Sequence, residues 1–253
     1  MVPGLRHSGR AARRSTALIA ILLVALLASC TSADGSGGAS GGDSPGTPAL
    51  AQGDGTFPGD YRIRGTNPDT SRYRGTLTID GDETGALALD WDTSGSYEGV
   101  GVAEGDFLAA THGDGGTACN VAIYPIGPDG LLDGRWVSSE GRGPTVEAVA
   151  SVIPGGPGIG GSYAIEGTGV DGVDYSGSMD VVDAGEAFEV TRQVGGFLSK
   201  GSALRVGDVL AVGFGDPTCA VIVYTKDANG HLAGIWGASG VQNPGREQAT
   251  PDD

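Results

Sequence analysis

The residues of this chain that could do nucleophilic or metal chemistry are few, with three cysteines and three histidines among 253 residues. An internal repeat places Phe214 and Leu131 at the positions that match His112 and His231, so neither histidine is duplicated. Two cysteines with unmatched histidines do not have the spacing of a zinc site, and no Gly-x-Ser-x-Gly elbow occurs at a strand–helix junction, where it would mark a serine nucleophile. We therefore predict a protein that is not an enzyme and carries no metal or other cofactor.

Cys119 and Cys219 open two stretches of equal length, CNVAIYPIGPDGLLDGRW and CAVIVYTKDANGHLAGIW, which share seven residues at the same places. An even pair of cysteines in an oxidising compartment is compatible with a disulfide between the two copies. Each cysteine, however, lies on the same face of its predicted strand as the apolar residues two and four places further on, and this face is expected to point into a core. Two thiols inside separate cores could not reach the Cα spacing of roughly 5–6 Å that a disulfide needs. We therefore predict two buried free thiols, with a disulfide as the first alternative and a reactive or metal-binding role as the second.

The first thirty residues have the pattern of an export signal. Four arginines precede an apolar run from Ala17 to Ala28, which is shorter than the roughly 20 residues that span a bilayer and suits a signal peptide. The following Leu27-Ala28-Ser29-Cys30 resembles the lipobox of bacterial lipoproteins. The resemblance implies that residues 1–29 are removed and that Cys30 becomes a lipidated N-terminus bearing palmitate or a similar acyl chain. The protein would then be anchored in the cell envelope, on the exported side of a bacterial membrane; an ordinary cleaved signal is the alternative.

Charge and composition describe the segment that follows. Without the four signal arginines, 11 basic and 31 acidic residues leave a net charge of −20. Such a surface repels nucleic acid and anionic lipid headgroups, so we predict no nucleic-acid partner and attachment to the membrane only through the N-terminal lipid. Residues 30–56 are mostly Gly, Ser, Asp and Pro, and they are predicted to form a disordered linker.

The rest of the chain is an internal repeat. GDYRIRG from Gly59 matches GSYAIEG from Gly161, and YRGTLTI from Tyr73 matches YSGSMDV from Tyr175, at an offset of 102 that becomes 100 at the cysteines. We therefore predict one β-domain over residues 57–153, a second over residues 159–246, and a disordered tail at 247–253.

Apolar and polar residues alternate in each copy, as in half-buried strands, and turn residues separate about seven such runs. The predicted fold is all-β, with two tandem antiparallel meander barrels of the lipocalin or avidin type or two sandwiches. One large sheet shared by both copies is the alternative. Residues 145–153 could supply an eighth strand to the first copy, whereas their counterpart near residues 246–250 is polar, so the second copy could be open or close differently.

Large aromatic residues lie at inward positions of the two copies, and all but Trp91 recur at matching positions. They are predicted to be core residues, with a ligand-lining role as the alternative: Tyr61, Tyr73, Trp91, Trp136, Tyr163, Tyr175 and Trp236. Paired glycines opposite these aromatics are expected to make room for the rings. Because Arg192 takes the place of Trp91 in the second copy, any cavities should differ between the copies.

A family resemblance rests on GDYRIRGTNPDTSRYRGTLTI followed by Leu-x-Gly-x-Trp, which is similar to a group of small exported bacterial β-domains, some labelled fibronectin-binding. The Gly-x-Tyr of the first strand also resembles lipocalin-like and avidin-like barrels. The resemblance implies a non-enzymatic binding or adhesion lipoprotein with an extracellular protein partner. Two further hypotheses are a carrier of a small apolar ligand inside a barrel and a structural envelope lipoprotein.

Overall fold

A computed structural model describes residues 56–81, 85–113, 118–128, 131–139, 145–154, 158–169 and 171–252. The predicted signal peptide, Cys30 and the predicted linker up to residue 55 lie outside the described residues. The described part contains strands and no helix, which confirms the all-β prediction. Within these ranges there is accordingly no helix of the length and apolar character needed to cross a bilayer.

Each sequence copy supplies eight strands. The first copy contains β1 (Gly59–Thr66), β2 (Arg72–Gly81), β3 (Leu87–Asp92), β4 (Ser96–Glu104), β5 (Phe107–His112), β6 (Asn120–Pro125), β7 (Leu132–Val137) and β8 (Thr145–Pro154). The second copy contains β9 (Gly161–Thr168), β10 (Asp174–Asp183), β11 (Ala187–Val194), β12 (Phe197–Val206), β13 (Val209–Gly215), β14 (Ala220–Lys226), β15 (Leu232–Gly237) and β16 (Gly245–Pro251).

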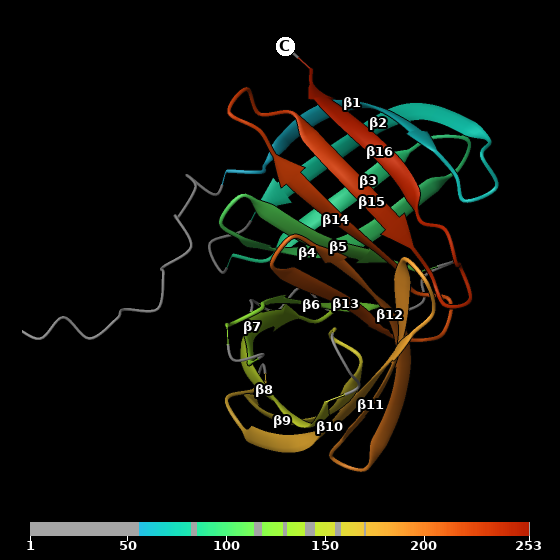
Figure 1. Cartoon of the computed structure of the whole chain (residues 1–253). Helices are drawn as coiled ribbons and strands as arrows, with labels where there is room; N and C mark the ends of the chain where they lie inside the picture. The colour runs from blue at the N-terminus through green and yellow to red at the C-terminus, as the bar shows by residue number, and fades with distance from the viewer. Residues whose placement is uncertain are drawn as a thin grey trace, which may run out of the picture. The chain divides into compact units, whose positions relative to one another are not determined.

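The strands close into two antiparallel barrels, and each barrel contains strands of both copies (Figure 1). Barrel 1 has the order β1-β2-β3-β4-β5-β14-β15-β16, with β16 paired to β1. Barrel 2 has the order β9-β10-β11-β12-β13-β6-β7-β8, with β8 paired to β9. Each copy therefore keeps its first five strands and exchanges its last three with the other copy.

This exchange changes several details of the sequence-based prediction. The barrels do not follow the repeat boundaries, because residues 57–153 and 159–246 each contribute to both barrels. Residues 145–154 do form the predicted eighth strand. The disordered tail predicted at 247–253 is wrong, because Gly245–Pro251 form β16, which closes barrel 1. Its polar residues alternate with Gly245, Glu247 and Ala249, which are the buried positions.

Four strands at the exchange are apolar on both faces. The central residues of β5, β6, β13 and β14 are almost all buried, unlike the alternating pattern of β1, β3 and β9. On β6, Ala122 and Tyr124 face the interior of barrel 2, whereas Val121 and Ile123 join a separate cluster. That cluster also contains residues of β4, β5, β12, β13 and β14, so it is a core shared by the two barrels.

The shared core explains why the prediction of two free thiols is wrong. Cys119 and Cys219 form a disulfide, with their Cα atoms 5.7 Å apart. Both cysteines do have the parity of Val121 and Val221, but that parity leads to the shared core and not to two separate barrel interiors. The cysteines precede β6 and β14, the first exchanged strand of each copy, so the disulfide links the two exchanged segments.

The disulfide is expected to stabilise the exchanged arrangement. The Cys119→Ser/Cys219→Ser double variant should lower the free energy of unfolding by about 2–5 kcal/mol, because the bridge joins residues 100 positions apart. Urea unfolding of the two proteins measures this difference. Thiol titration of the denatured, unreduced protein is the direct control, and a finding that both residues react as free thiols would contradict the assignment.

Candidate functional site

A carboxylate lies buried inside barrel 1. Glu247 on β16 is 4% exposed. The hydroxyl of Tyr73 on β2 donates to its Oε2 at 2.8 Å, and the hydroxyl of Tyr224 on β14 donates to its Oε1. The indole N–H of Trp91 on β3 donates to the Tyr224 hydroxyl at 3.1 Å. The carboxylate is thus held by side chains from separate parts of the barrel wall.

Barrel 2 repeats this arrangement with the matching residues. Glu147 on β8 is 2% exposed. It accepts hydrogen bonds from Tyr124 on β6, at Oε1, and from Tyr175 on β10, at Oε2 and 2.5 Å. The repeat therefore conserves within one chain a unit of one glutamate and two tyrosines, and we call this unit the Glu–Tyr₂ cluster.

Glycines make the cluster possible. The cross-strand neighbours of Glu247 are Gly65 on β1 and Gly234 on β15. A Cβ added to Gly65 would lie 2.2 Å from the ring of Tyr73, and one added to Gly234 would lie 2.7 Å from the ring of Tyr224. The tyrosine rings thus occupy the space beside the glutamate that side chains at these positions would need. Gly134 and Gly167 flank Glu147 in the same way, which agrees with the predicted role of paired glycines.

Burial changes the acidity of these groups. Burial raises the pKa of Glu247, and hydrogen bonding by Tyr224, Tyr73 and Trp91 opposes the rise without cancelling it. Burial, followed by the charge of Glu247, raises the pKa of Tyr224 and Tyr73, so both stay protonated donors. The folded protein keeps the Glu247 proton to a higher pH than the unfolded chain does. The contribution of Glu247 to the free energy of unfolding therefore falls as pH rises from its pKa in the unfolded chain to its higher pKa in the folded protein.

The two clusters differ in one neighbour. Leu77 on β2 pairs with Trp91, and the matching Met179 on β10 pairs with Arg192, so Trp91 and Arg192 occupy equivalent positions. Arg192 is 3% exposed, and its Nη2 donates to Oε2 of Glu147. Although burial works against the charged guanidinium, electrostatic interactions with Tyr124, Glu147 and Tyr175 and the hydrogen bond to Glu147 raise the pKa of Arg192. Barrel 2 therefore contains a buried ion pair at this place.

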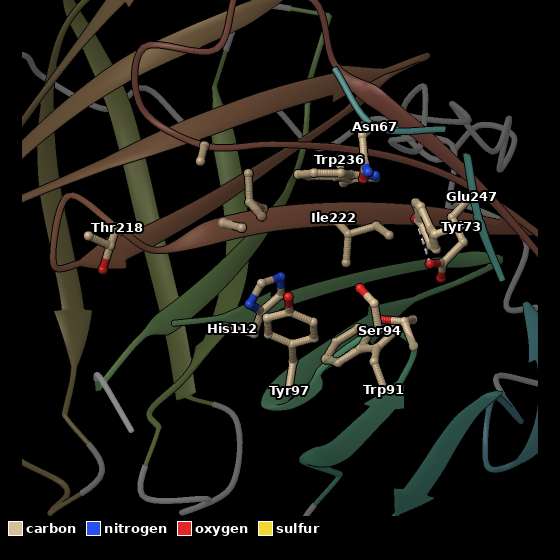
Figure 2. Close-up of a pocket in the computed structure, with 14 residues that line it drawn as sticks. Asn67, Tyr73, Trp91, Ser94, Tyr97, His112, Thr218, Ile222, Trp236 and Glu247 are labelled. Carbon is tan, nitrogen blue, oxygen red and sulfur yellow. Dashed lines mark hydrogen bonds between the residues drawn. The ribbon is translucent and has the colours of Figure 1, made fainter. Parts of the chain in front are cut away.

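Barrel 1 contains a cavity of about 340 Å³ beside its cluster. Figure 2 shows Tyr73 and Glu247 at one end, with the Trp236 ring across the cavity from Trp91 and Tyr97. His112 completes the aromatic lining, with its ring centroid 5.6 Å from that of Trp91 and 4.9 Å from that of Tyr97. Such a site can accept hydrogen bonds from a ligand, hold a positive charge, or exchange a proton with a bound group.

The structure brings together only part of the predicted set of aromatics. Tyr73, Trp91 and Trp236 line the cavity of barrel 1. Tyr61 and Tyr163 are core residues whose hydroxyls donate to the backbone carbonyls of Phe57 and Ile159. Trp136 and Tyr175 pack in barrel 2, where their rings are in edge-to-face contact.

Four residues of the two Glu–Tyr₂ clusters were not singled out from the sequence: Glu147, Glu247, Tyr124 and Tyr224. Glu247 was assigned to the disordered tail. The signal was present, because the offset of 100 that aligns the cysteines also aligns both glutamates and both of these tyrosines. Among the described residues no group of three or more His, Cys, Asp or Glu could hold a metal ion.

Comparisons of this chain with protein-family models, with curated proteins and with solved structures find no match.

The glycine beside Glu247 can be tested against a glycine on the same strand. Gly234→Ala should displace the Tyr224 ring and cost about 1–3 kcal/mol of stability, because the new Cβ would lie 2.7 Å from Tyr224. Gly237→Ala is the control, since its Cβ would lie at an ordinary 3.7 Å from Leu204. Urea unfolding measures both variants, and equal costs would contradict the proposed close fit.

The buried ion pair of barrel 2 can be tested by breaking it in two ways. Arg192→Met leaves the Glu147 charge uncompensated and should cost about 3–5 kcal/mol, whereas the Glu147→Gln/Arg192→Met double variant should recover most of that loss. The matched change in barrel 1, Glu247→Gln, breaks no ion pair and should cost about 1 kcal/mol or less at neutral pH. Chemical denaturation of the four proteins measures these values. A double variant as unstable as Arg192→Met would contradict the charge assignment.

Proposed function

We propose that this protein is a non-enzymatic, lipid-anchored binding protein of the bacterial cell envelope, and that it takes a small ligand into the cavity of barrel 1. The observation that carries the proposal is the lined cavity beside Glu247. Its volume of about 340 Å³ lies at the lower end of the range for small-molecule sites, so the ligand should be small.

The lining of the cavity supports binding of a ligand with both apolar and polar parts. Five of its fourteen lining residues are aromatic, while the Glu247 carboxylate and the hydroxyl of Tyr73 provide polar groups at one end. Sites of this kind bind through burial of apolar surface and use a few polar groups to orient the ligand. A purely apolar ligand, the carrier hypothesis from sequence, would leave the carboxylate desolvated without a partner in the ligand.

Barrel 2 is proposed as the structural partner of this site. The position equivalent to Trp91 carries Arg192, which is buried and paired with Glu147. The position equivalent to His112 carries Phe214, over which the guanidinium lies 3.9 Å from the ring centroid. These two replacements use the matching space for an internal contact, so the two barrels should not bind the same ligand.

Attachment to the membrane is part of the proposal and is supported by the sequence. The lipobox-like Leu-Ala-Ser-Cys and the long Gly/Ser-rich segment after it fit a binding domain tethered to a membrane surface. A tether of this kind would let the cavity sample ligands outside the membrane without diffusing away from the cell.

Adhesion to an extracellular protein remains a second candidate. The feature that favours it is the hairpin between β11 and β12, where Phe197 is 81% exposed and Leu198 is 64% exposed. Neighbouring large apolar side chains on a surface are typical of contact sites for other macromolecules. This hairpin belongs to barrel 2, so an adhesive contact there and a ligand in barrel 1 are compatible.

The binding proposal can be tested with fluorescence. In a Trp136→Phe background the two remaining tryptophans, Trp91 and Trp236, both line the cavity. Pools of small amines, sugars, nucleosides and fatty acids should include members that change this emission in a saturable way. Ala238→Phe, which places a ring in the cavity lining, should abolish the response.

The matched control is Ala233→Phe, at an exposed position of β15. It should leave the response intact. If no pool member gives a saturable response that Ala238→Phe removes, the cavity is not a binding site and the proposal fails.

A further inference from the structure

We propose that the ligand of the barrel 1 cavity carries an organic cation, a guanidinium or a substituted ammonium group, which binds the Glu247 carboxylate between aromatic rings. This inference rests on the proposed function, because it names the chemical class of the ligand for the same cavity. The observation behind it is that barrel 2 supplies such a cation from its own chain.

Arg192 shows what the Glu–Tyr₂ cluster accepts. Its guanidinium donates to Glu147 through Nη2 and lies over the ring of Phe214, 3.9 Å from the centroid. For its Nε and Nη1 no hydrogen-bond acceptor is found among the described residues. One carboxylate, two tyrosine hydroxyls and one ring are thus enough to hold a buried guanidinium in this fold.

The same elements recur in barrel 1, where no lysine or arginine of the described residues lines the cavity. Tyr73, Tyr224 and Glu247 match Tyr175, Tyr124 and Glu147, and both glutamates lie between two cross-strand glycines. Oε2 of Glu147 accepts from Tyr175 and Arg192, whereas Oε2 of Glu247 accepts from Tyr73.

Electrostatics favours a cation at this place. A carboxylate removed from water without an opposite charge is costly, and burial indeed raises the pKa of Glu247. A cation beside it would favour the ionised form. Coulomb attraction is stronger in the low-dielectric interior of a barrel than at the surface. A monocation in the cavity is therefore attracted more strongly by Glu247 than it would be by a carboxylate exposed to water.

Aromatic residues around the carboxylate favour an organic cation over a metal ion. Trp91, Trp236 and Tyr97 line the cavity, and the faces of Trp and Tyr rings attract Arg-like and ammonium-like cations. Glu247 supplies the single carboxylate of the lining, and the described residues contain no group of three or more His, Cys, Asp or Glu that could hold a metal ion such as Ca²⁺ or Mg²⁺. The donor set therefore selects for a cation with apolar substituents.

Four arginines, Arg64, Arg72, Arg74 and Arg246, lie on β1, β2 and β16 near Tyr73 and Glu247. All four are exposed. Charges in water are screened over about 10 Å at ordinary ionic strength. Because all four are exposed to solvent, their repulsion of a cation at the buried carboxylate is screened.

The test compares two probes that differ in charge and hardly in shape. Propylguanidine is the Arg192 side chain from Cβ outward, and propylurea is its neutral counterpart. Titration followed by NMR and by fluorescence in the Trp136→Phe background should show saturable binding of propylguanidine, with propylurea at least tenfold weaker. Glu247→Gln should reduce propylguanidine affinity at least tenfold and narrow the difference between the probes.

Trp91→Arg provides the second variant. It installs in barrel 1 the residue that barrel 2 has at this position, so an internal guanidinium should compete with the probe. We expect loss of propylguanidine binding, and a raised melting temperature would show that the variant folds with the new ion pair. Retained binding in this folded variant would overturn the inference.

The remaining outcomes separate this inference from the proposed function. Equal binding of both probes, abolished by Ala238→Phe, would overturn the cation and keep the cavity as a binding site. If neither probe binds but a neutral or anionic pool member binds the cavity, the cation would again be overturned and the cavity kept as a binding site. Absence of binding by the probes and by every pool would overturn both proposals.

A pH titration provides an independent readout, because guanidinium stays charged throughout. Affinity should fall as pH is lowered through the pKa of Glu247, by up to tenfold per pH unit.

The titratable groups facing Glu247 are Tyr73 and Tyr224, whose raised pKa values keep them protonated, with Tyr97 and His112 across the cavity. The cross-strand neighbours of Glu247 on β1 and β15 are Gly65 and Gly234, which have no titratable side chain. His112→Phe, which installs the Phe214 of barrel 2, removes the imidazole, and the pH dependence should persist; its loss would overturn the assignment to Glu247.

Discussion

A carboxylate taken out of water has to be compensated, and this constraint organises the interior of both barrels. Each glutamate accepts hydrogen bonds from two tyrosine hydroxyls on different strands, because a buried charge without partners would cost several kcal/mol. The tyrosines reach it only because glycines flank the glutamate on both neighbouring strands. Tyrosines, glycines and glutamate therefore depend on one another, which accounts for their joint presence in both copies.

The exchange of three strands between the copies makes the two barrels depend on each other. Neither copy closes a barrel with its own last strands; closure comes from the partner copy, and the strands at the exchange bury both of their faces. The outer faces of these strands form the shared core, so the two barrels stabilise each other. The disulfide between Cys119 and Cys219 lies where both exchanged segments begin and fixes this arrangement covalently.

Duplication has produced two barrels with one scaffold and two different interiors. The Glu–Tyr₂ cluster is the same in both, but Trp91 stands in barrel 1 where barrel 2 has Arg192, and His112 stands where barrel 2 has Phe214. In barrel 2 the charge of the carboxylate is neutralised within the chain. In barrel 1 the same carboxylate lies beside a cavity lined by aromatic rings. The replacements of Trp91 by Arg192 and of His112 by Phe214 are thus two of the differences between the aromatic-lined cavity of barrel 1 and the internal ion pair of barrel 2.

The sequence by itself determined the strands, because alternation of apolar and polar residues follows directly from the two faces of a strand. It also determined the inward aromatics, the role of their glycines and the eighth strand at residues 145–154. Only the tertiary structure decided which copy closes which barrel. The two copies are similar in sequence, so the last three strands of either copy could pair with the first five strands of the other or of its own copy. This ambiguity explains the errors over Cys119, Cys219 and the segment at 247–253. The parity of a residue along a strand indicates that it is buried, but not in which core it is buried. The burial of Glu247 on the polar strand β16 can be recognised only when the neighbouring strands are known.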